Sequence, residues 1–360
     1  MTDVKSVSSQ LLVQAAREQG LKVRVFSKRL NFFEVSNGKQ SLLIQATAMP
    51  TNSQMGARIA NNKFLTKKIL QDHNLPTPRS WSVQKASELR KIVDKYHPFP
   101  LVVKPAEGAH GNEVYSFIEN INELNDVIKE VFDRKAPRDI LVEEYVTGKD
   151  LRIFVVGDTV PAVLERIPAH VIGDGEKTIR QLVKVFNQNP LVGEKYEKPM
   201  CKIHLTKEVK RILTKQGLTL TSIPQKGETA WLRKTANIST GGIGKDATDS
   251  TPESIKRMAV EACAVIGLNI AGLDVIYNEE TKRAVILEIN DTAGIDIHHF
   301  PVIGQSRDVA GAIMKQLFSE TNTQFDLQKA QTSSHIPAWA NGSLPSFFGK
   351  HRLVKRLLFQ

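Results

Sequence analysis

Hydrophobic residues recur at helical spacing in some stretches of the chain and gather in short strand-like runs in others. The helical spacing, together with capping and stop residues, predicts helices over residues 8–19, 61–73, 86–96, 121–134, 178–187, 206–215 and 251–267. The short apolar runs predict strands over residues 21–26, 32–35, 42–45, 101–104, 140–145, 151–156, 160–166, 271–277 and 283–289. Because hairpins are mixed with helices, the order is not a regular βαβ alternation. It predicts an α+β fold, with mixed α/β lobes around a cleft.

Several helix boundaries carry their own signals. Asn61 or Asn62 is suited to cap the helix that ends before Pro76. Thr251 supplies a capping hydroxyl and Pro252 a first helical residue, and Gly267 is a stop for that helix. Periodicity is lost after about residue 320. We therefore expect an N-terminal α/β lobe (1–60), a central lobe with a glycine-bearing loop (61–150), a C-terminal lobe with the metal and substrate site (151–320) and a basic tail (321–360).

Composition narrows the classes of protein. Of 360 residues, 41% are hydrophobic and 24% charged, which excludes wholesale disorder. The formal net charge of +11 suits nucleic acid, an anionic surface, or phosphorylated and carboxylated small molecules. Cys201 and Cys263 are too few for a disulfide framework or a cysteine-based zinc site, so we expect reduced thiols. Residues 1–10 lack a signal-like apolar segment and 259–276 carry charges, so we expect a cytoplasmic protein without a membrane span.

Two carboxylates and an amide lie in the last two predicted strands. Side chains alternate between the faces of a strand, so Glu288 and Asn290 point the same way. If these strands pair as a hairpin, Asp274 falls opposite residues 286–288. Two carboxylates and an amide oxygen then share one face, which is costly without a compensating cation. Mg²⁺ prefers such hard oxygen ligands together with phosphate oxygens, and the alternative is a solvated face with surface acids.

A glycine-bearing loop follows the apolar strand that ends at Lys104. Residues 105–112 read Pro-Ala-Glu-Gly-Ala-His-Gly-Asn. Glycine lets backbone N–H groups approach a phosphate closely, and the lysine adds a positive charge. The segment matches neither a Walker loop nor a dinucleotide-binding fingerprint, and taken alone it suits a plain β-turn.

Other polar residues favour a nucleotide site. Residues 143–146 end a predicted strand, where their backbone groups suit an adenine edge, and Asp150 suits ribose hydroxyls. Arg152 and Arg166 lie on neighbouring predicted strands, and a surface ion pair is an equal alternative for each.

Taken in order, these motifs resemble the ATP-grasp superfamily. The series consists of Lys63, Val103-Lys104-Pro105, the loop 108–111, Glu143–Val146 with Asp150 and Arg152, Asp274, and Glu288-x-Asn290. Within the superfamily the sequence is most similar to the cyanophycin synthetase and bifunctional glutathione synthetase branch, through residues 166–175, 235–242 and 294–301. The likeness covers about residues 30–318.

The resemblance implies three lobes, with ATP held between two antiparallel-sheet subdomains, and a carboxylate–amine ligase that forms an acyl phosphate. The implied ATP contacts are Lys63, Lys104, Gly108, His110, Gly111, Asn112, Glu143, Glu144, Tyr145, Val146 and Asp150. The implied metal ligands are Asp274, Glu288 and Asn290, for two Mg²⁺ ions or Mn²⁺ in their place. The implied catalytic residues are Arg166, Asn237, Gly241 and Gly242, and the implied substrate contacts are His170, Arg233 and His298.

The sequence also departs from the family pattern. Ala293 stands where the family often has proline, and Asp291 adds a charge. Gly272 stands where relatives place an arginine two residues before the metal aspartate, so Arg166 would serve alone. Residues 244–246 stand where the family has an apolar–Asp–β-branched pattern, so the resemblance does not identify the substrate. No Mur-type or glutamate–cysteine ligase lobe accompanies the core, so we do not expect complete cyanophycin or two-step glutathione synthesis from this chain alone.

We expect the substrates to be an amino acid or small peptide, with a glutamate- or aspartate-like carboxylate favoured, and an amine. We expect a homo-oligomer, a dimer or tetramer, without nucleic-acid or membrane partners. The alternatives are a ligase that adds amino acids to a protein C-terminus, a non-catalytic nucleotide-binding protein, and a nucleic-acid-binding protein. The basic residues are dispersed outside residues 350–356 and no RNA-binding motif occurs, which disfavours the last alternative.

Overall fold

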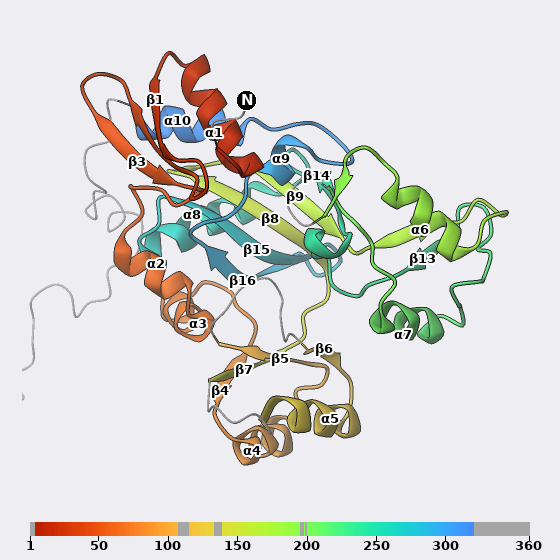
Figure 1. Cartoon of the computed structure of the whole chain (residues 1–360). Coiled ribbons are helices and arrows are strands. Elements are labelled where there is room, and N and C mark those ends of the chain that lie inside the picture. Colours follow the sequence, from red (N-terminus) through yellow and green to blue (C-terminus); the bar gives the residue numbers. More distant parts are fainter. Residues whose placement is uncertain (1–3, 107–114, 133–138, 195–197, 199, 320–360) are drawn as a thin grey trace, which may run out of the picture. The chain divides into compact units, whose positions relative to one another are not determined.

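The computed structural model describes residues 4–106, 115–132, 139–194, 198 and 200–319 (Figure 1). Its helices are α1 (Val7–Glu18), α2 (Gln54–Ala60), α3 (Lys63–Asp72), α4 (Ala86–Tyr96), α5 (Ile121–Phe132), α6 (Ile179–Asn187), α7 (Lys207–Lys215), the 3₁₀ helix η1 (Ile238–Thr240), α8 (Glu253–Ile266), α9 (Asp296–His299) and α10 (Val309–Leu317). Its strands are β1 (Lys22–Ser27), β2 (Phe32–Ser36), β3 (Ser41–Gln45), β4 (Ser80–Val83), β5 (Leu101–Pro105), β6 (Tyr115–Ile118), β7 (Ile140–Glu144), β8 (Lys149–Val156), β9 (Thr159–Ile167), β10 (His170–Ile172), β11 (Val192–Gly193), β12 (Met200–Cys201), β13 (Thr229–Trp231), β14 (Ile243–Asp246), β15 (Ile270–Asn278) and β16 (Arg283–Asn290).

The predicted helices and strands are confirmed, with differences at their ends. Asn62 caps α3, because its side chain accepts a hydrogen bond from the Leu65 N–H at 2.9 Å. Gly267 ends α8 with φ of 82°, a conformation that favours glycine. The start of α8 was predicted wrongly. Pro252 takes the cap position, and the Thr251 hydroxyl donates to the Ala247 carbonyl instead of capping the helix.

Antiparallel sheets carry most of the described strands. A five-stranded sheet has the order β14-β9-β8-β15-β16, and a four-stranded sheet has the order β4-β7-β5-β6. The hairpins β1-β2-β3 form a third sheet. These sheets, covered by helices, confirm the predicted mixed α+β class.

The two faces of the five-stranded sheet differ in character. On one face Leu151, Ile153 and Leu273 pack in an apolar core with α8 and with residues of α2 and α3. On the other face Phe154 and Ala162 pack against α1 and α10. Further along the same strands, this second face becomes charged. An antiparallel sheet can carry such different faces because successive side chains alternate.

Two smaller cores complete the described part of the chain. The four-stranded sheet packs against α4 and α5, and β10 and β13 pack with α6 and α7. Cys201 and Cys263 are buried and not disulfide-bonded, which agrees with the expected reduced thiols. Among the residues that the structure describes, no helix is both long enough and apolar enough to cross a membrane. The predicted tail, residues 321–360, lies outside the described residues, and the domain boundaries stay predictions.

Candidate active site

A β-bulge in β16 sets the register of the two carboxylates. Val275 of β15 lies opposite Ile286. The preceding residue of β15, Asp274, lies opposite Glu288. Leu287 is therefore the extra residue of β16 between the two pairs. With regular pairing Asp274 would face Leu287, and the Glu288 side chain would turn toward the apolar face. The predicted convergence of Asp274 and Glu288 is therefore confirmed, and the bulge is its cause.

Four charged side chains meet on the second face of the five-stranded sheet. Arg152 of β8 lies opposite Asp274, and its Nε donates to Asp274 Oδ1 at 2.6 Å. Arg166 of β9 lies opposite Asp150, and its Nη2 donates to Asp150 Oδ1 at 2.6 Å. The same Nη2 lies 3.1 Å from Asp274 Oδ2. Asp274 is thus held between two guanidinium groups from adjacent strands.

The electrostatics of this cluster fix its charge state. Burial would raise the pKa of Asp274, but Arg152 and Arg166 hold it below its ordinary value. For Asp150, burial raises the pKa, opposed by Arg166 and assisted by the Asp274 carboxylate. Burial opposes the charge of Arg166, yet the two carboxylates raise its pKa further above neutrality. The face therefore keeps two fixed cations beside an ionised Asp274.

Arg152 fills the space beside Gly272. A Cβ atom at Gly272 would lie 3.1 Å from Arg152 Nη1 and 2.5 Å from Ala293 Cβ. An arginine two residues before Asp274 has no room here, and the neighbouring strand supplies the guanidinium instead. Arg152 and Arg166 both contact Asp274, and the expectation that Arg166 alone serves the acyl phosphate stays a prediction. Sequence reasoning had included Arg152 in the ATP-grasp motif series without giving it a role in the site.

A second charged cluster lies between α3 and the four-stranded sheet. Glu143 of β7 is 2% exposed, with Lys104 Nζ 2.8 Å from its Oε2 and Lys67 Nζ 3.0 Å from its Oε1. Lys67 is 1% exposed and also donates to the Leu287 carbonyl at 2.8 Å. The bulge residue of β16 is thereby tied to the strand that carries Glu143.

Burial and pairing oppose each other in this cluster. Burial lowers the pKa of Lys67 to about 8, although Glu143 limits the fall. Burial opposes the charge of Lys104 as well, but Glu143 raises its pKa above the ordinary value. The two lysines outweigh burial and lower the pKa of Glu143. Sequence reasoning missed Lys67. The available signal was its position one helical turn after Lys63, on the same side of α3 as buried Leu70.

Glu288 and Asn290 of β16 are partly exposed oxygen-bearing side chains next to the buried Asp274. The Asn290 amide donates to Glu288 Oε1 at 3.4 Å, so both residues share a face, as predicted. Lys63 Nζ lies 3.8 Å from Glu288 Oε2. Among the described residues no group of three His, Cys, Asp or Glu side chains is placed to hold a metal ion. A cation here would use the amide of Asn290 besides the carboxylates of Asp274 and Glu288, and this hard-oxygen set fits Mg²⁺ or Mn²⁺.

The predicted adenine segment, residues 143–146, begins at Glu143. The Glu144 N–H donates to the Arg79 carbonyl, and the Tyr145 N–H donates to the Pro100 carbonyl. Burial, assisted by Asp150, raises the pKa of Tyr145, which places Asp150 near both the segment and Arg166. Val146 is partly buried. The predicted loop residues Gly108, His110, Gly111 and Asn112 lie outside the described residues.

The glycines after Asn237 lie beside the strand that carries Arg166. The Asn237 carbonyl accepts from the N–H groups of Thr240 and Gly242, closing a tight turn. Gly241 has φ of 95°, and a Cβ atom there would collide with Ile203. A Cβ atom at Gly242 would lie 3.0 Å from the Ile167 carbonyl oxygen, so the turn is packed on β9. A role of Asn237, Gly241 and Gly242 in catalysis stays a prediction.

The predicted substrate residues lie in two places. His170 Nδ1 is 2.8 Å from the Pro168 carbonyl, and its ring lies near Trp231. Arg233 donates from Nη2 to Thr206 Oγ1 at 3.3 Å, and its Nε has no hydrogen-bond partner among the described residues. Their contact with substrate stays a prediction.

His298 of α9 is a buried histidine at the border of the charged face. It is 1% exposed, its ring lies edge-on to Phe154, and neither ring nitrogen has a hydrogen-bond partner in the described part of the chain. Burial, with the nearby charge of Arg152, lowers its pKa to about 3. His298 is therefore neutral at physiological pH, and its predicted contact with substrate stays untested.

Replacement of Glu143 by glutamine should destabilise the protein strongly. The change leaves Lys67 and Lys104 buried without their anion, and the loss of one partner of a buried ion pair costs about 3–5 kcal/mol. The matched control is Glu144→Gln, because Glu144 pairs at 3.4 Å with a half-exposed Arg79 and should cost less than about 1 kcal/mol. Urea denaturation measures both free energies of unfolding. Equal, small losses would contradict the paired role of Glu143.

Replacement of His298 by leucine should change the acid dependence of stability. Between the ordinary pKa of 6.5 and the folded value of about 3, the unfolded chain binds a proton at His298 that the folded chain does not. Stability that His298 contributes is therefore lost as pH falls through this window. We expect His298→Leu to lose about 1 kcal/mol less per pH unit than wild type between pH 6 and pH 4. Urea denaturation at several pH values measures the free energy of unfolding of both proteins. If it falls with the same slope against pH in wild type and in His298→Leu, His298 is protonated in the folded state.

Comparison with known proteins agrees with this geometry. Residues 60–174 match the model of the RimK-like ATP-grasp domain. Cyanophycin synthetase of Crocosphaera subtropica is 36% identical over 316 residues, which cover 86% of this chain and 36% of that protein. The glutathione biosynthesis bifunctional protein GshAB of Clostridium perfringens is 35% identical over 320 residues, which cover 87% and 41%.

A solved structure leads to the same family. The crystal structure of a bifunctional glutathione synthetase from Pasteurella multocida superposes with a TM-score of 0.68 at 30% identity, covering 88% of this chain and 44% of that one. The chain spans roughly two-fifths of the length of the curated relatives that it matches. With the sheets and the charged face described above, these likenesses show a RimK-like ATP-grasp domain over residues 60–174, in a chain that is similar over most of its length to part of these synthetases.

Proposed function

We propose that the protein is an ATP- and Mg²⁺-dependent carboxylate–amine ligase. In this reaction a substrate carboxylate oxygen attacks the γ-phosphorus of ATP, and ADP leaves. An amine nitrogen then attacks the carbonyl carbon of the acyl phosphate, inorganic phosphate leaves, and the nitrogen loses a proton to solvent. The observation that carries the proposal is the pair Asp274 and Glu288 on one face, flanked by Arg152 and Arg166.

The proposed nucleotide contacts follow from the second cluster. Lys63 and Lys104 would neutralise phosphate oxygens, and the loop 108–112 would close over them. Lys104 is held in place by Glu143, and Glu143 is in turn held by Lys67, so a lysine at the nucleotide edge is pre-oriented rather than mobile. Residues 143–146 would line the adenine ring, and Asp150 would accept from the ribose.

The proposed metal site uses Asp274, Glu288 and Asn290. A bound Mg²⁺ supplies positive charge that draws phosphate oxygens to these side chains and stabilises charge on the transferred phosphoryl group. The chain's own contribution is to keep Asp274 ionised, because Arg152 and Arg166 lower its pKa. We propose two ions, because the triphosphate of ATP carries more negative charge than Lys63 and Lys104 balance.

Arg166, with Arg152 beside it, is proposed to stabilise the acyl phosphate and the tetrahedral species that follows. Both guanidinium groups are fixed by carboxylates, so their donors point in set directions before the substrate arrives. Neither needs to reorganise as negative charge develops. Asn237, Gly241 and Gly242 would contact substrate or phosphate from the turn beside β9.

The proposed substrates are an amino acid or small peptide and an amine, with an acidic carboxylate favoured. The names of the relatives, cyanophycin synthetase and bifunctional glutathione synthetase, support this class, and His170, Arg233 and His298 are the proposed contacts. A homo-oligomeric assembly and a cytoplasmic location remain predictions. Addition of amino acids to a protein C-terminus differs only in which molecule carries the carboxylate.

Phosphate release over a panel of amino acids and dipeptides tests the proposal. A ligase should release ADP and phosphate only when one carboxylate and one amine are present together, and mass spectrometry should detect their amide. Nucleotide binding without turnover for every pair would favour the non-catalytic alternative. Tight, salt-sensitive nucleic-acid binding without turnover would favour the alternative of a nucleic-acid-binding protein.

Glu288→Gln should abolish turnover and leave ATP binding nearly intact. The change removes one negative charge from the proposed metal site but keeps the side-chain shape, so we expect turnover to fall more than about 100-fold, with a change of less than about threefold in nucleotide affinity. The matched control is Asp291→Asn, one carboxylate outside the proposed ligand set. Unchanged turnover in Glu288→Gln would exclude the proposed metal assignment.

A further inference from the structure

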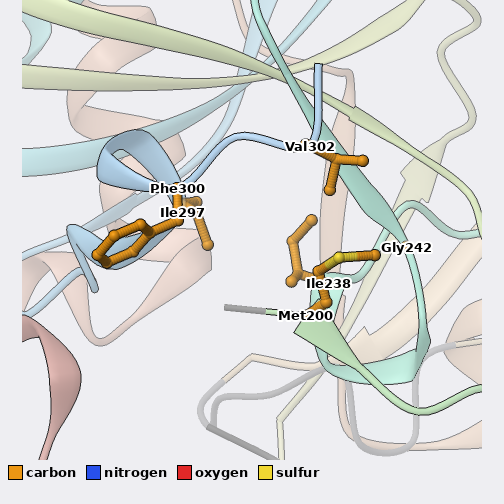
Figure 2. Close-up of a pocket in the computed structure, with 7 residues that line it drawn as sticks. Met200, Ile238, Gly242, Ile297, Phe300 and Val302 are labelled. Carbon is orange, nitrogen blue, oxygen red and sulfur yellow. The ribbon is translucent and has the colours of Figure 1, made fainter. Parts of the chain in front are cut away.

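The turn that carries Asn237, Gly241 and Gly242 is closely packed on its apolar side. Figure 2 shows an apolar pocket there, and the labelled lining residues are Met200, Ile238, Gly242, Ile297, Phe300 and Val302. The pocket has a volume of about 10 Å³, which is room for about one water molecule and not for a substrate side chain. The turn is thus held on this side, and the chain that leads into it, residues 232–236, is its connection to the rest of the site.

A second β-bulge lies in β6, at Phe117. Ser116 of β6 lies opposite Val102 of β5. Two positions further along β6, Ile118 lies opposite Leu101, which is the neighbour of Val102. Phe117 is therefore the extra residue of β6 between the two pairs, as Leu287 is in β16. Ile118 keeps its place in the core of the four-stranded sheet, and the Phe117 side chain stays partly exposed.

The backbone of Phe117 is left-handed, with φ of 61°. A Cβ atom disfavours this region, and for a bulky aromatic residue the conformation is rare and raises the conformational free energy. Glycine or asparagine would adopt it with less strain. A phenylalanine keeps such a conformation only where the surrounding contacts hold it, so the contacts of its ring are the relevant observation.

The Phe117 ring contacts two segments that are distant in sequence. The Tyr145 ring packs against it in an edge-on arrangement, with 5.0 Å between the ring centroids and an interplanar angle of 80°. The Lys234 ammonium lies over the Phe117 ring, 3.6 Å from its centroid, which is a cation–π geometry. Tyr145 belongs to the proposed adenine segment, and Lys234 lies between Arg233 and the turn that begins at Asn237. One ring therefore joins the adenine segment to the chain that leads to the turn.

The charges around Lys234 belong to the same two parts of the chain. Partial burial, together with the nearby charge of Lys215, lowers the pKa of Lys234, and Glu119 opposes this fall. Lys215 Nζ of α7 lies 3.7 Å from Glu119 Oε2 and 3.7 Å from Glu123 Oε1. These three side chains are all partly exposed to solvent, so their ion pairs are weak. The ring of Phe117 is thus the specific contact of Lys234, and Lys215 provides a matched cation that pairs with carboxylates instead.

We propose that Phe117 is a positioning residue for the nucleotide, which acts through Tyr145, and that Lys234 fixes its ring. The inference rests on the proposed function, because it takes residues 143–146 as the adenine segment. An adenine ring that binds along this segment needs Tyr145 to keep its place at the end of β7, and the Phe117 ring supports Tyr145 from the side. The bulge and the left-handed backbone turn the ring to this position. The adenine segment and the chain that leads to Asn237 thus share one support.

The test measures by calorimetry how tightly the full chain binds a non-hydrolysable ATP analogue with Mg²⁺. Phe117→Leu keeps an apolar side chain but removes the ring, and should weaken binding at least about fivefold. Phe117→Tyr keeps the ring and should restore the affinity to within about twofold of wild type. Lys234→Met removes only the cation from an exposed side chain, and should weaken binding about threefold. Lys215→Met is the matched control and should change the affinity less than about 1.5-fold.

A double variant separates a link through the ring from a general attraction between Lys234 and the phosphates of ATP. If the ring carries the effect, Lys234→Met should change the affinity of the Phe117→Leu variant less than about 1.5-fold, because the two substitutions remove the same contact. An equal threefold loss in wild type and in Phe117→Leu would overturn the link through the ring. Unchanged affinity in Phe117→Leu would overturn the positioning role.

The same variants keep this proposal separate from the proposed function. The expected pattern of analogue affinities, without turnover of any pair of carboxylate and amine, would refute the ligase function and support the role of Phe117. Turnover in wild type, with equal analogue affinity in Phe117→Leu, Lys234→Met and Lys215→Met, would refute the role of Phe117 and keep the ligase.

Discussion

The register between β15 and β16 is the constraint on which the proposed chemistry depends. The bulge at Leu287 turns Glu288 toward Asp274 and leaves the Leu287 carbonyl to accept from Lys67. Without the extra residue, Glu288 would point into the apolar core under the sheet, where an unpaired carboxylate is strongly disfavoured. A single irregular position therefore both assembles the carboxylate pair and attaches it to the buried lysine.

The charged side chains around this bulge form ion pairs with one another before any ligand binds. Arg152 and Arg166 keep Asp274 ionised, and Lys67 and Lys104 do the same for Glu143. In a nearly buried setting these pairs are rigid and their donors are directed before a ligand binds, which is the property that electrostatic stabilisation of a reacting anion requires. The cost is that each group depends on its partner, since removal of one leaves a buried charge unpaired.

Much of this could be predicted from sequence, and the remainder depends on tertiary structure. Alternation along the last strand predicted that Glu288 and Asn290 share a face, because side-chain direction follows from local backbone geometry. The bulge at Leu287 could not be predicted, since a regular hairpin has the same sequence pattern. Lys67 and Arg152 were not assigned because their partners are distant in the chain, and the space that Arg152 fills exists only where β8 meets β15. The apolar pocket likewise joins segments about a hundred residues apart.

The central claim is that the face shared by Asp274, Glu288 and Asn290 binds a divalent cation together with the nucleotide phosphates. The most direct measurement is a crystal structure with a non-hydrolysable ATP analogue and Mn²⁺, in which anomalous scattering locates the metal. The account predicts Mn²⁺ bound by oxygens of these three side chains and by phosphate oxygens of the analogue. A bound analogue whose metal lies away from all three side chains would contradict it.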